Sequence, residues 1–485
     1  MNFWRTCLLV ALVGCGRTGA DSGLAMGFGG SAGTSTASGG TAGTVGSGGT
    51  AGVGGVGAAA GDSGAPPPTG DTLWGVRGDG NGAVRAVAVT KDGRVVAAGV
   101  FSGTMDFGAG AMTSAGGNDI FVVSYDAQGK CLWSERFGGT KDDAANAVGM
   151  DENGAAYVSG AFMDSMIVGG TTLSSVGGYD VPLIVLDASG AVISANSYGS
   201  ASSDFGFHVD VRNGVVAMIG ASRGPITFGG SVLTGVESSF VVAQTTAGAH
   251  VFSRIFDELS IESVAIDATG HVAIGGSFND TTDLGTGPIT PKASTDGFVA
   301  RLSPTGDTLF THPVGDGKTV SGYAVATSAA GDVVFGGMAT AQGAPDSFVQ
   351  LERVTASGTV LWSKQLGTAD YAAANALAID ASGSVILAGL VRDGVVDLGC
   401  GPHTIAKDEA HKYAGDVLVA KLDQSGACMW SKTFGPTHMQ FGGDVVVDSL
   451  SRIYVGGYFQ GSIDFGSGPV DATHPSEPFV LSLAP

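Results

Sequence analysis

The sequence lacks long apolar runs and has little charge. No apolar stretch approaches the roughly 18 residues that a membrane-spanning helix requires, and no segment shows the periodicity of an amphipathic helix. Charged residues make up only 14% of the chain, whereas apolar residues make up 44%. These features argue against helical and membrane-spanning architectures and favour sheets that are buried on both faces.

Basic side chains are scarce. The chain has 23 Lys and Arg against 44 Asp and Glu, which gives a net charge of −21, and the whole excess falls within residues 71–485. An acidic body repels nucleic acid and anionic lipid, so we expect neither as a partner.

Motifs for catalysis and metal binding are missing. The chain has no D-x-D-x-D-G calcium loop, no G-G-x-G-x-D series and no H-E-x-x-H motif. Gly29–Gly33 matches the G-x-S-x-G nucleophile pattern, but the strand and helix which that pattern needs are absent from the surrounding sequence. Asp143, Asp204 and Asp370 recur before the first strand of their units, where turn capping accounts for them. We therefore expect a protein that is not an enzyme and holds no metal or cofactor.

The first residues form an export signal. Arg5 precedes the apolar run Leu8–Val13, and the run ends in Leu12-Val13-Gly14-Cys15, which resembles the lipobox of bacterial lipoproteins. The resemblance implies that residues 1–14 are a signal peptide and that Cys15 is lipidated and becomes the new N-terminus. Glycine rather than aspartate at position 16 favours the outer membrane, with the chain facing the periplasm or the cell surface. An ordinary secretory signal that contains a cysteine is the alternative.

Residues 15–70 are rich in Gly, Ala, Ser and Thr and close in Pro66-Pro67-Pro68. They have almost no bulky apolar side chains to bury, so they cannot offset the entropy of their own ordering. We expect a disordered tether between the anchor and a folded part at residues 71–485.

The folded part consists of a repeat whose signature is G-x-x-(L/I/V/M)-(W/F)-S. The chain has five tryptophans, and all except Trp4 occupy the same repeat position. Phenylalanine takes that position in two further copies and Ser194 in one, which gives seven copies at spacings of 52 to 68 residues. A bulky aromatic at one fixed place in each unit is a packing device between neighbouring units. These aromatic residues are Trp74, Trp133, Phe252, Phe310, Trp362 and Trp430.

Two other signatures recur in step with the first. One is a small-residue turn before an apolar strand that ends in glycine, as in Asp92 to Gly99, and the other is an apolar run such as Phe121-Val122-Val123, matched in the fifth unit by Phe348-Val349. Each unit thus offers four short strands separated by turns. The apolar runs are continuous rather than alternating, which indicates radially stacked sheets that cover each other's faces.

The two ends of the folded part complement each other. The last unit stops one strand short, at Leu481–Pro485, and a strand of the missing type stands at Asp71–Trp74. Pairing the two removes both exposed sheet edges. We therefore predict an all-β fold: a single seven-bladed β-propeller of four-stranded antiparallel blades, closed by the N-terminal strand, which completes the last blade.

The units resemble the bacterial SBBP beta-propeller repeat family, whose copies carry D-x-x-G-N-V-Y-V-x-G, G-G-x-D-x-F-V-x-K and D-x-x-G-x-x-x-W-S-x-x-F-G. Gly116–Val122 and Trp133–Gly138 match closely, and the resemblance covers residues 71–485. It implies the propeller fold and export, and the family has no common activity to carry over. The Asp-Ala-x-Gly-x-x-Leu-Trp element is also similar to the docking motif of PQQ-type propellers, where it is structural, so it implies no quinone.

Two cysteines lie in the sixth and longest unit. Outside the cytoplasm, Cys400 and Cys428 predict a disulfide that ties a loop to the outer strand of the same blade. Cys131 takes the place of Cys428 in the first unit, but no cysteine stands where its partner would be. A zinc site of Cys400, His403, His411 and Cys428 is the alternative, although its ligands are scattered over a loop.

The anchor, the tether and the missing catalytic motifs favour a surface-tethered binding or scaffold lipoprotein. Its partner would be an unknown protein or glycan, it would touch the membrane only through its lipid, and we expect a monomer. The site would lie on the face formed by the variable loops, most of all in the sixth unit. The candidate binding residues are His403, Lys407, Asp408, Glu409, His411 and Lys412.

Two other classes of function stay open. One is an exported enzyme directed at polysaccharide, which would be favoured by three or more acids with raised pKa within about 10 Å of one another at the channel. The other is a component of an envelope assembly, which would be favoured by an exposed apolar patch on the outer rim. Arg77-Gly78-Asp79 is an adhesion tripeptide of a kind that acidic, glycine-rich chains also produce by accident.

Overall fold

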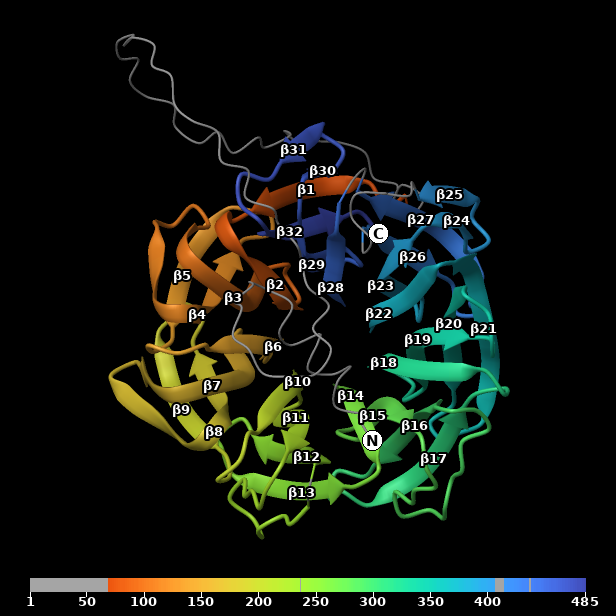
Figure 1. The fold of residues 1–485 in the computed structure, drawn as a ribbon, viewed down its shortest axis with the longest axis horizontal. Helices are drawn as coiled ribbons and strands as arrows, with labels where there is room; N and C mark the ends of the chain where they lie inside the picture. The colour runs from red at the N-terminus through yellow and green to blue at the C-terminus, as the bar shows by residue number, and fades with distance from the viewer. Residues whose placement is uncertain (1–68, 236, 406–413, 436–437) are drawn as a thin grey trace, which may run out of the picture. The chain divides into compact units, whose positions relative to one another are not determined.

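The computed structural model describes residues 69–235, 237–405, 414–435 and 438–485. One compact unit takes in Gly64–Pro485. Its described residues form strands and turns, and none of them belongs to a helix that could cross a membrane. Seven four-stranded antiparallel sheets are arranged radially around a central axis (Figure 1). The predicted seven-bladed propeller is confirmed.

Each blade has four strands, counted outward from the axis. The inner strands are β2 (Asp79–Val89), β6 (Ala144–Met150), β10 (Phe205–Arg212), β14 (Leu259–Ile266), β18 (Thr319–Thr327), β22 (Tyr371–Ile379) and β28 (Gln440–Val447). The second strands are β3 (Val95–Asp106), β7 (Ala156–Val168), β11 (Val215–Ser222), β15 (Val272–Phe278), β19 (Val333–Thr340), β23 (Val385–Arg392) and β29 (Ile453–Phe459).

The third and outer strands complete the blades. The third strands are β4 (Met112–Tyr125), β8 (Thr171–Leu186), β12 (Ser238–Thr245), β16 (Asp296–Leu302), β20 (Ser347–Val354), β26 (Asp416–Leu422) and β32 (Glu477–Leu483). The outer strands are β5 (Cys131–Phe137), β9 (Val192–Tyr198), β13 (His250–Phe256), β17 (Thr308–Val314), β21 (Val360–Ala369), β27 (Cys428–Phe434) and β1 (Thr72–Arg77).

The ring closes in blade 7, whose outer strand comes from the other end of the folded part. Strand β1 pairs antiparallel with β32, with Trp74 opposite Ser482 and Val76 opposite Val480. The Ala484 N–H donates to the Asp71 carbonyl over 2.7 Å. The closure predicted from the incomplete last unit is therefore present.

A glycine within each second strand allows the inner strand to bulge. The register of every inner strand shifts by one residue opposite this glycine, as between Val84 and Ala86 in blade 1. A Cβ added at Gly99 would lie 2.0 Å from the Ala83 carbonyl oxygen. The same clash recurs at the other six glycines, so only glycine fits there. They are Gly160, Gly220, Gly276, Gly337, Gly389 and Gly457.

The repeated aromatic packs on the next blade. Trp133 covers Gly190, in the turn that joins the third and outer strands of blade 2, and its indole N–H donates to the Ala188 carbonyl of that turn over 3.0 Å. Trp74 and Trp362 make the same hydrogen bond. For Trp430 the corresponding carbonyl is that of residue 68, outside the described residues. Phe252 and Phe310 cover Gly306 and Gly358 in the same way.

Hairpins between the second and third strands fill the seams between blades from outside. We call them seam hairpins, and each lies between the outer strand of its own blade and that of the preceding blade. In blade 1, Phe107 packs in one cluster with Trp74 and Val76 of β1, while Gly108 lies against Cys131 of β5. Blades 6 and 7 form them from β24 (Gly394–Asp397) with β25 (Pro402–Ile405) and from β30 (Ser462–Asp464) with β31 (Pro469–Asp471).

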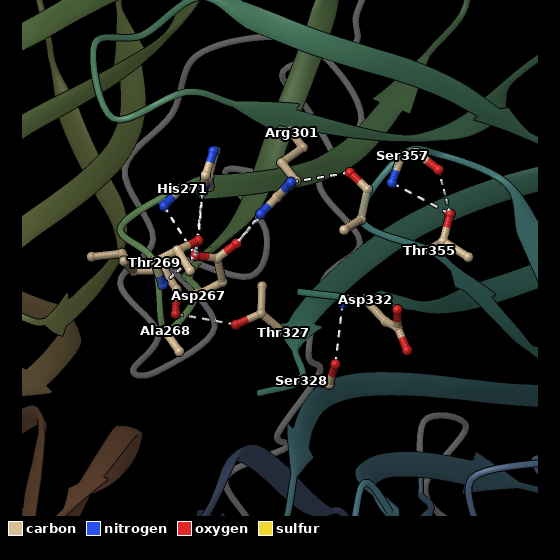
Figure 2. A network of polar contacts seen from close by, with 12 residues as sticks. Asp267, Ala268, Thr269, His271, Arg301, Thr327, Ser328, Asp332, Thr355 and Ser357 are labelled. Atoms are coloured by element: carbon tan, nitrogen blue, oxygen red, sulfur yellow. Dashed lines mark hydrogen bonds and ion pairs between the residues drawn. The ribbon is translucent and has the colours of Figure 1, made fainter. Parts of the chain in front are cut away.

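The other two connections of each blade are tight turns on the opposite face. At the turn of blade 4, the hydrogen bonds from Thr269 and Arg301 outweigh burial and lower the pKa of Asp267 to about 2. Arg301 also donates to the Ala356 carbonyl of blade 5 over 3.0 Å. Figure 2 shows Arg301 between Asp267 of blade 4 and the turn of blade 5 that contains Thr355 and Ser357. Arg353 makes equivalent contacts, because it forms an ion pair with Asp332 of blade 5 and donates to the Gly383 carbonyl of blade 6. Buried cations thus join neighbouring blades on this face.

A buried aspartate stands at the same place in the third strand of three blades, and Glu477 takes that place in blade 7. The side chains of Asp119, Asp180 and Asp296 each accept an N–H from four residues earlier. Each carboxyl carbon lies 2.1 to 2.6 Å from the Cβ position of a glycine just beyond the end of the outer strand, namely Gly138, Gly199 and Gly315. A side chain in place of this glycine would collide with the carboxylate. The aspartate of the G-G-x-D motif and the glycine of the F-G motif therefore recur together in the sequence.

The third strand of the fifth blade is placed differently from our sequence alignment. The register puts Gln350, not Phe348, opposite Gly337, the place that Phe298 has opposite Gly276 in blade 4. Matching Phe348-Val349 to the apolar runs of the other units was wrong by two residues, because this strand has polar residues where those runs are apolar.

We predict that Trp133→Ala lowers the free energy of unfolding by about 2–3 kcal/mol, because it leaves a gap over Gly190 and removes the bond to Ala188. Ser194→Ala, at the same repeat position in blade 2, is the matched control and should cost less than about 0.5 kcal/mol. Urea unfolding of both variants measures the difference, and equal costs would contradict the seam role of the aromatic.

Candidate functional site

The sixth blade carries the longest connection between a second and a third strand, residues 393–415. Cys400, in the turn of its seam hairpin, is joined by a disulfide to Cys428 at the start of β27, with a Cα–Cα distance of 5.5 Å. Both sulfurs are occupied, so neither is a thiolate for the alternative zinc site. Cys131 is free and half-buried, and burial, reinforced by Asp106, raises the pKa of its thiol to about 11.

The predicted binding residues fall into two groups. His403 lies on β25, where its Nε2 is 2.8 Å from the Ser431 hydroxyl of the neighbouring outer strand. This contact holds the hairpin against β27. Lys407, Asp408, Glu409, His411 and Lys412 lie outside the described residues, as does Cys15.

The residues that border 406–413 are held on both sides. Ile405 is buried in the core between blades 5 and 6. Gly415 donates its N–H to the His438 carbonyl over 3.2 Å and accepts one from Gln440 over 2.9 Å. Burial raises the pKa of Asp416, the first residue of β26, to about 7. The chain on either side of 406–413 is therefore held in place by the fold, and the carboxyl group of Asp416 close to it has a pKa near neutral.

The bulged residues of the inner strands form a ring around the axis of the propeller. Each is half-buried, and the residue before it is buried, as expected where a bulge turns a side chain toward the axis. In blade order they are Arg85, Asn146, Phe207, Glu262, Tyr323, Asn375 and Gly443. A ring of chemically different side chains thus stands on a strictly repeated backbone.

Several members of this ring bind the adjacent blade. Arg85 donates to the side-chain Oδ1 of Asn146 over 3.1 Å, and the Asn146 side chain donates in turn to the Gly206 backbone carbonyl over 2.9 Å. Burial lowers the pKa of Arg85 to about 10, which leaves it charged at neutral pH. Asn375 donates to the Gly442 carbonyl between blades 6 and 7.

Two aspartates and a histidine follow the bulges in blades 7 and 3. Asp444 accepts the Val87 N–H of blade 1 over 3.0 Å, and Asp210 accepts the Ile266 N–H of blade 4 over 2.6 Å. His208 accepts the Val264 N–H of blade 4 on Nδ1, so its neutral form carries the proton on Nε2.

Burial raises the pKa of both aspartates, while His208 and their backbone donors oppose the rise. The charge of Asp210 also raises the pKa of Asp444, so the two carboxylates interact. The channel therefore brings together two acids of raised pKa rather than the three that would favour a glycosidase-type site. Each is engaged by backbone N–H groups across a seam between blades.

The adhesion tripeptide belongs to the closure of the ring. Arg77 forms an ion pair with buried Glu477 and donates to the Asp471 carbonyl. His474 lies 3.2 Å from Glu477 and 3.7 Å from Asp79. Asp79, His474 and Glu477 are close enough together to bind a cation, but Arg77 already supplies positive charge to Glu477. The cluster acts as a polar lock between blades 7 and 1.

Sequence reasoning missed the ring of bulged residues. The signal was available, because Arg85, Asn146, Glu262 and Asn375 each stand at the same distance before the glycine turn that follows their strand. That shared spacing alone does not identify them, because a continuous apolar strand does not show which residue bulges toward the axis.

Comparison with known proteins gives few relatives by sequence. No protein-family model matches the chain. It is similar to Regulatory protein FlaEY of Caulobacter vibrioides, with 27% identity over 350 residues, which is 65% of this chain and 36% of that protein. The chain thus spans about a third of the length of the curated relative that it matches.

Comparison with solved structures gives matches at very low identity. The WD40 beta propeller domain of Doa1 superposes with a TM-score of 0.45 at 10% identity, covering 86% of this chain and 97% of that one. The Dos1 propeller gives a TM-score of 0.43 at 8% identity, covering 85% and 94%.

We predict that Asp416→Asn stabilises the protein at pH 8 and has no effect near pH 4. The pKa of Asp416 is about 7 in the folded chain and about 4 when unfolded. Its burial therefore costs nothing below pH 4, costs more as the pH rises to 7, and stays costly above. Urea unfolding at both pH values tests this, with exposed Asp370→Asn as the control. An unchanged stability of Asp416→Asn at pH 8 would contradict it.

Proposed function

We propose that this chain is an exported lipoprotein of the SBBP-repeat type that acts without catalysis, as a binding or scaffold propeller tethered to the outer membrane. Residues 1–14 serve as the signal peptide, Cys15 carries the lipid, and residues 15–70 hold the propeller away from the membrane. The partner is a protein or glycan at the cell surface, bound by a monomer through the segment 406–413 of the sixth blade.

One observation carries the proposal. The sixth blade alone has its seam hairpin joined by a disulfide to its own outer strand among the described residues, and the segment 406–413 follows directly from that hairpin. A fixed base lowers the entropy cost of presenting a binding loop. Lys407 and Lys412 balance Asp408 and Glu409, so the segment carries no net charge on an acidic chain. A regulatory role, which the name of FlaEY gives to that protein, is one that a binding propeller can serve.

The channel supports an enzyme less well. Asp210 and Asp444 each accept a hydrogen bond from a neighbouring blade, which accounts for their position without a substrate. A carboxylate that acts on a substrate needs a free oxygen in reach of the reacting bond.

The exposed apolar residues of the outer strands do not favour envelope assembly. In every blade the residue before the repeated aromatic position is aliphatic and exposed, by 39% to 59%. A whole blade separates each of these residues from the next, so they are scattered singly rather than gathered into a patch. They are Leu73, Leu132, Ile193, Val251, Leu309, Leu361 and Met429.

We predict that a variant with residues 406–413 replaced by a shorter Gly-Ser link loses its partner, with retention at least about tenfold weaker. Pull-down from envelope extracts and a glycan array measure it. The link begins after Ile405, so the contacts of His403 and the disulfide are kept.

Lys407→Ala/Lys412→Ala gives a milder form of the same test. Its matched control is Lys91→Ala/Lys130→Ala, which removes the same charge from exposed turns on the opposite face. Equal loss in the two double variants would trace binding to net charge, and full retention by the shortened loop would refute the site.

We predict that Cys15→Ser releases the protein from the membrane fraction, because the lipid is its only membrane contact. Fractionation of cells and labelling with a clickable fatty acid measure it. Membrane retention of the variant would contradict the anchor.

A further inference from the structure

Six of the seven seams are filled by a seam hairpin, and the seam between blades 4 and 5 is not. The apolar residue that enters each filled seam is Phe107, Val168, Phe228, Leu284, Leu398 or Phe465. In blade 5 only residues 341–346 join β19 to β20, and this connection is too short to form a seam hairpin. A cavity of about 410 Å³ is open along this seam, between β17 and β21.

The floor of this cavity is polar where the other blades are apolar. Gln350 takes the place of Phe121, Phe240, Phe298 and Phe479. Glu352 takes a place that is Val, Ile, Leu or Ala in every other blade, such as Ala300. Both side chains are buried, at 3% and 7% exposure of the residue, and both line the cavity.

The polar side chains are connected across the seam. Glu352 Oε1 lies 2.5 Å from His312 Nε2 of β17. The Gln365 side chain donates to the side-chain Oε1 of Gln350 over 3.0 Å, and the Gln350 side-chain amide donates to the Ser363 hydroxyl over 3.3 Å. The chain of contacts therefore runs over three strands and two blades.

Two acceptors remain open within this network. Glu352 uses Oε1 on His312, and no hydrogen bond from the described residues reaches Oε2, although the side chain is only 8% exposed. Gln365 likewise receives no donor on its carbonyl oxygen from the described part of the chain. Neither atom is enclosed by the protein, so both are open to the space of the cavity. A carboxylate at a repeat position that is otherwise apolar costs stability, so its retention there indicates a ligand.

The charges of the cavity wall balance one another. Lys292 donates to the Gly315 carbonyl, Asp316 forms an ion pair with Lys318, and the Glu352 carboxylate contacts the His312 imidazole. Two ammonium groups, of Lys292 and Lys318, thus stand against two carboxylates, of Asp316 and Glu352. Lys364 lines the cavity, but its Cε lies 2.7 Å from the Cβ position of Gly426 in the next blade, so its ammonium is directed away. The wall favours a ligand without net charge.

We propose that the seam between blades 4 and 5 binds a neutral mono- or disaccharide. Amide, carboxylate, imidazole and hydroxyl groups offer donors and acceptors together, which suits the hydroxyls of a sugar. The cavity is at the small end of the roughly 300–1,000 Å³ range of small-ligand sites. A peptide hairpin in place of the missing one is disfavoured, because its apolar tip would bury Gln350 and Glu352 without partners. This site is separate from segment 406–413, so either can fail alone.

The test is saturation-transfer NMR and calorimetry on the intact chain with glucose, galactose, N-acetylglucosamine, maltose and cellobiose at about 10 mM, the range of weak sugar binding. Glucuronate is the charged arm, and a peptide of residues 462–471, which form a seam hairpin in blade 7, is the peptide arm. We expect at least one neutral sugar to bind and the two other arms to bind at least about tenfold more weakly.

The decisive variant is Gln350→Phe/Glu352→Ala, which installs the residues of blade 4 at these two positions. It should weaken sugar binding at least about tenfold while the melting temperature stays equal or rises. Glu352→Gln keeps the acceptor and the shape and should bind within about threefold of the wild type. If the double variant does not fold, Gln365→Ala serves instead, since this side chain is only half-buried.

Three results would overturn the proposal: undiminished sugar binding by Gln350→Phe/Glu352→Ala, preference for glucuronate or the peptide, or no binding of any sugar by the wild type. None of them bears on segment 406–413, whose own variants leave the seam unchanged.

Discussion

The pairing of β1 with β32 is the constraint on which the rest of the structure depends. A blade of this protein is apolar on both faces, and only its neighbours can cover it. A ring gives every blade two neighbours, but an incomplete last blade would expose a strand edge and an apolar face. Arg77 with Glu477, and the lock around His474, secure the seam at which the two ends of the folded part meet.

Within the closed ring, a few repeated contacts set the shape of each unit. A glycine of the second strand admits the bulge of the inner strand, and a glycine after the outer strand admits the buried aspartate. The aromatic of one blade rests on the turn glycine of the next. Because these contacts join different strands or blades, they recur in the sequence as motifs whose members lie far apart.

The repetition also makes the departures from it informative. Blade 6 adds a disulfide at its seam hairpin, and blade 5 lacks a hairpin altogether and has Gln350 and Glu352 in place of apolar residues. Neither departure improves packing, and the second one costs stability. We therefore expect functional sites where a single blade differs from the others, and not in the features that all seven blades share.

The short spacing between Phe310 and Trp362 was visible in the sequence, yet its meaning was not. A missing hairpin can be read as a deletion from one unit, but the seam that it leaves open is bounded by β17 of the preceding unit. Likewise, Arg85 and Asn146 are 61 positions apart, and their contact exists only because adjacent blades place their bulges side by side.

The sequence by itself determined the class of fold, the number of blades, the strand that closes the ring and the aromatic that marks six of the seven seams. These follow from local patterns repeated seven times, in which each copy reinforces the reading of the others. Only the tertiary structure decided which side chains line the channel, that Gln350 stands where Phe298 stands in blade 4, and that one seam is open. Those outcomes depend on strand register and on contacts between units. A shift of two residues keeps the same face of a strand toward its neighbour, so the pattern of apolar residues along the strand does not reveal it.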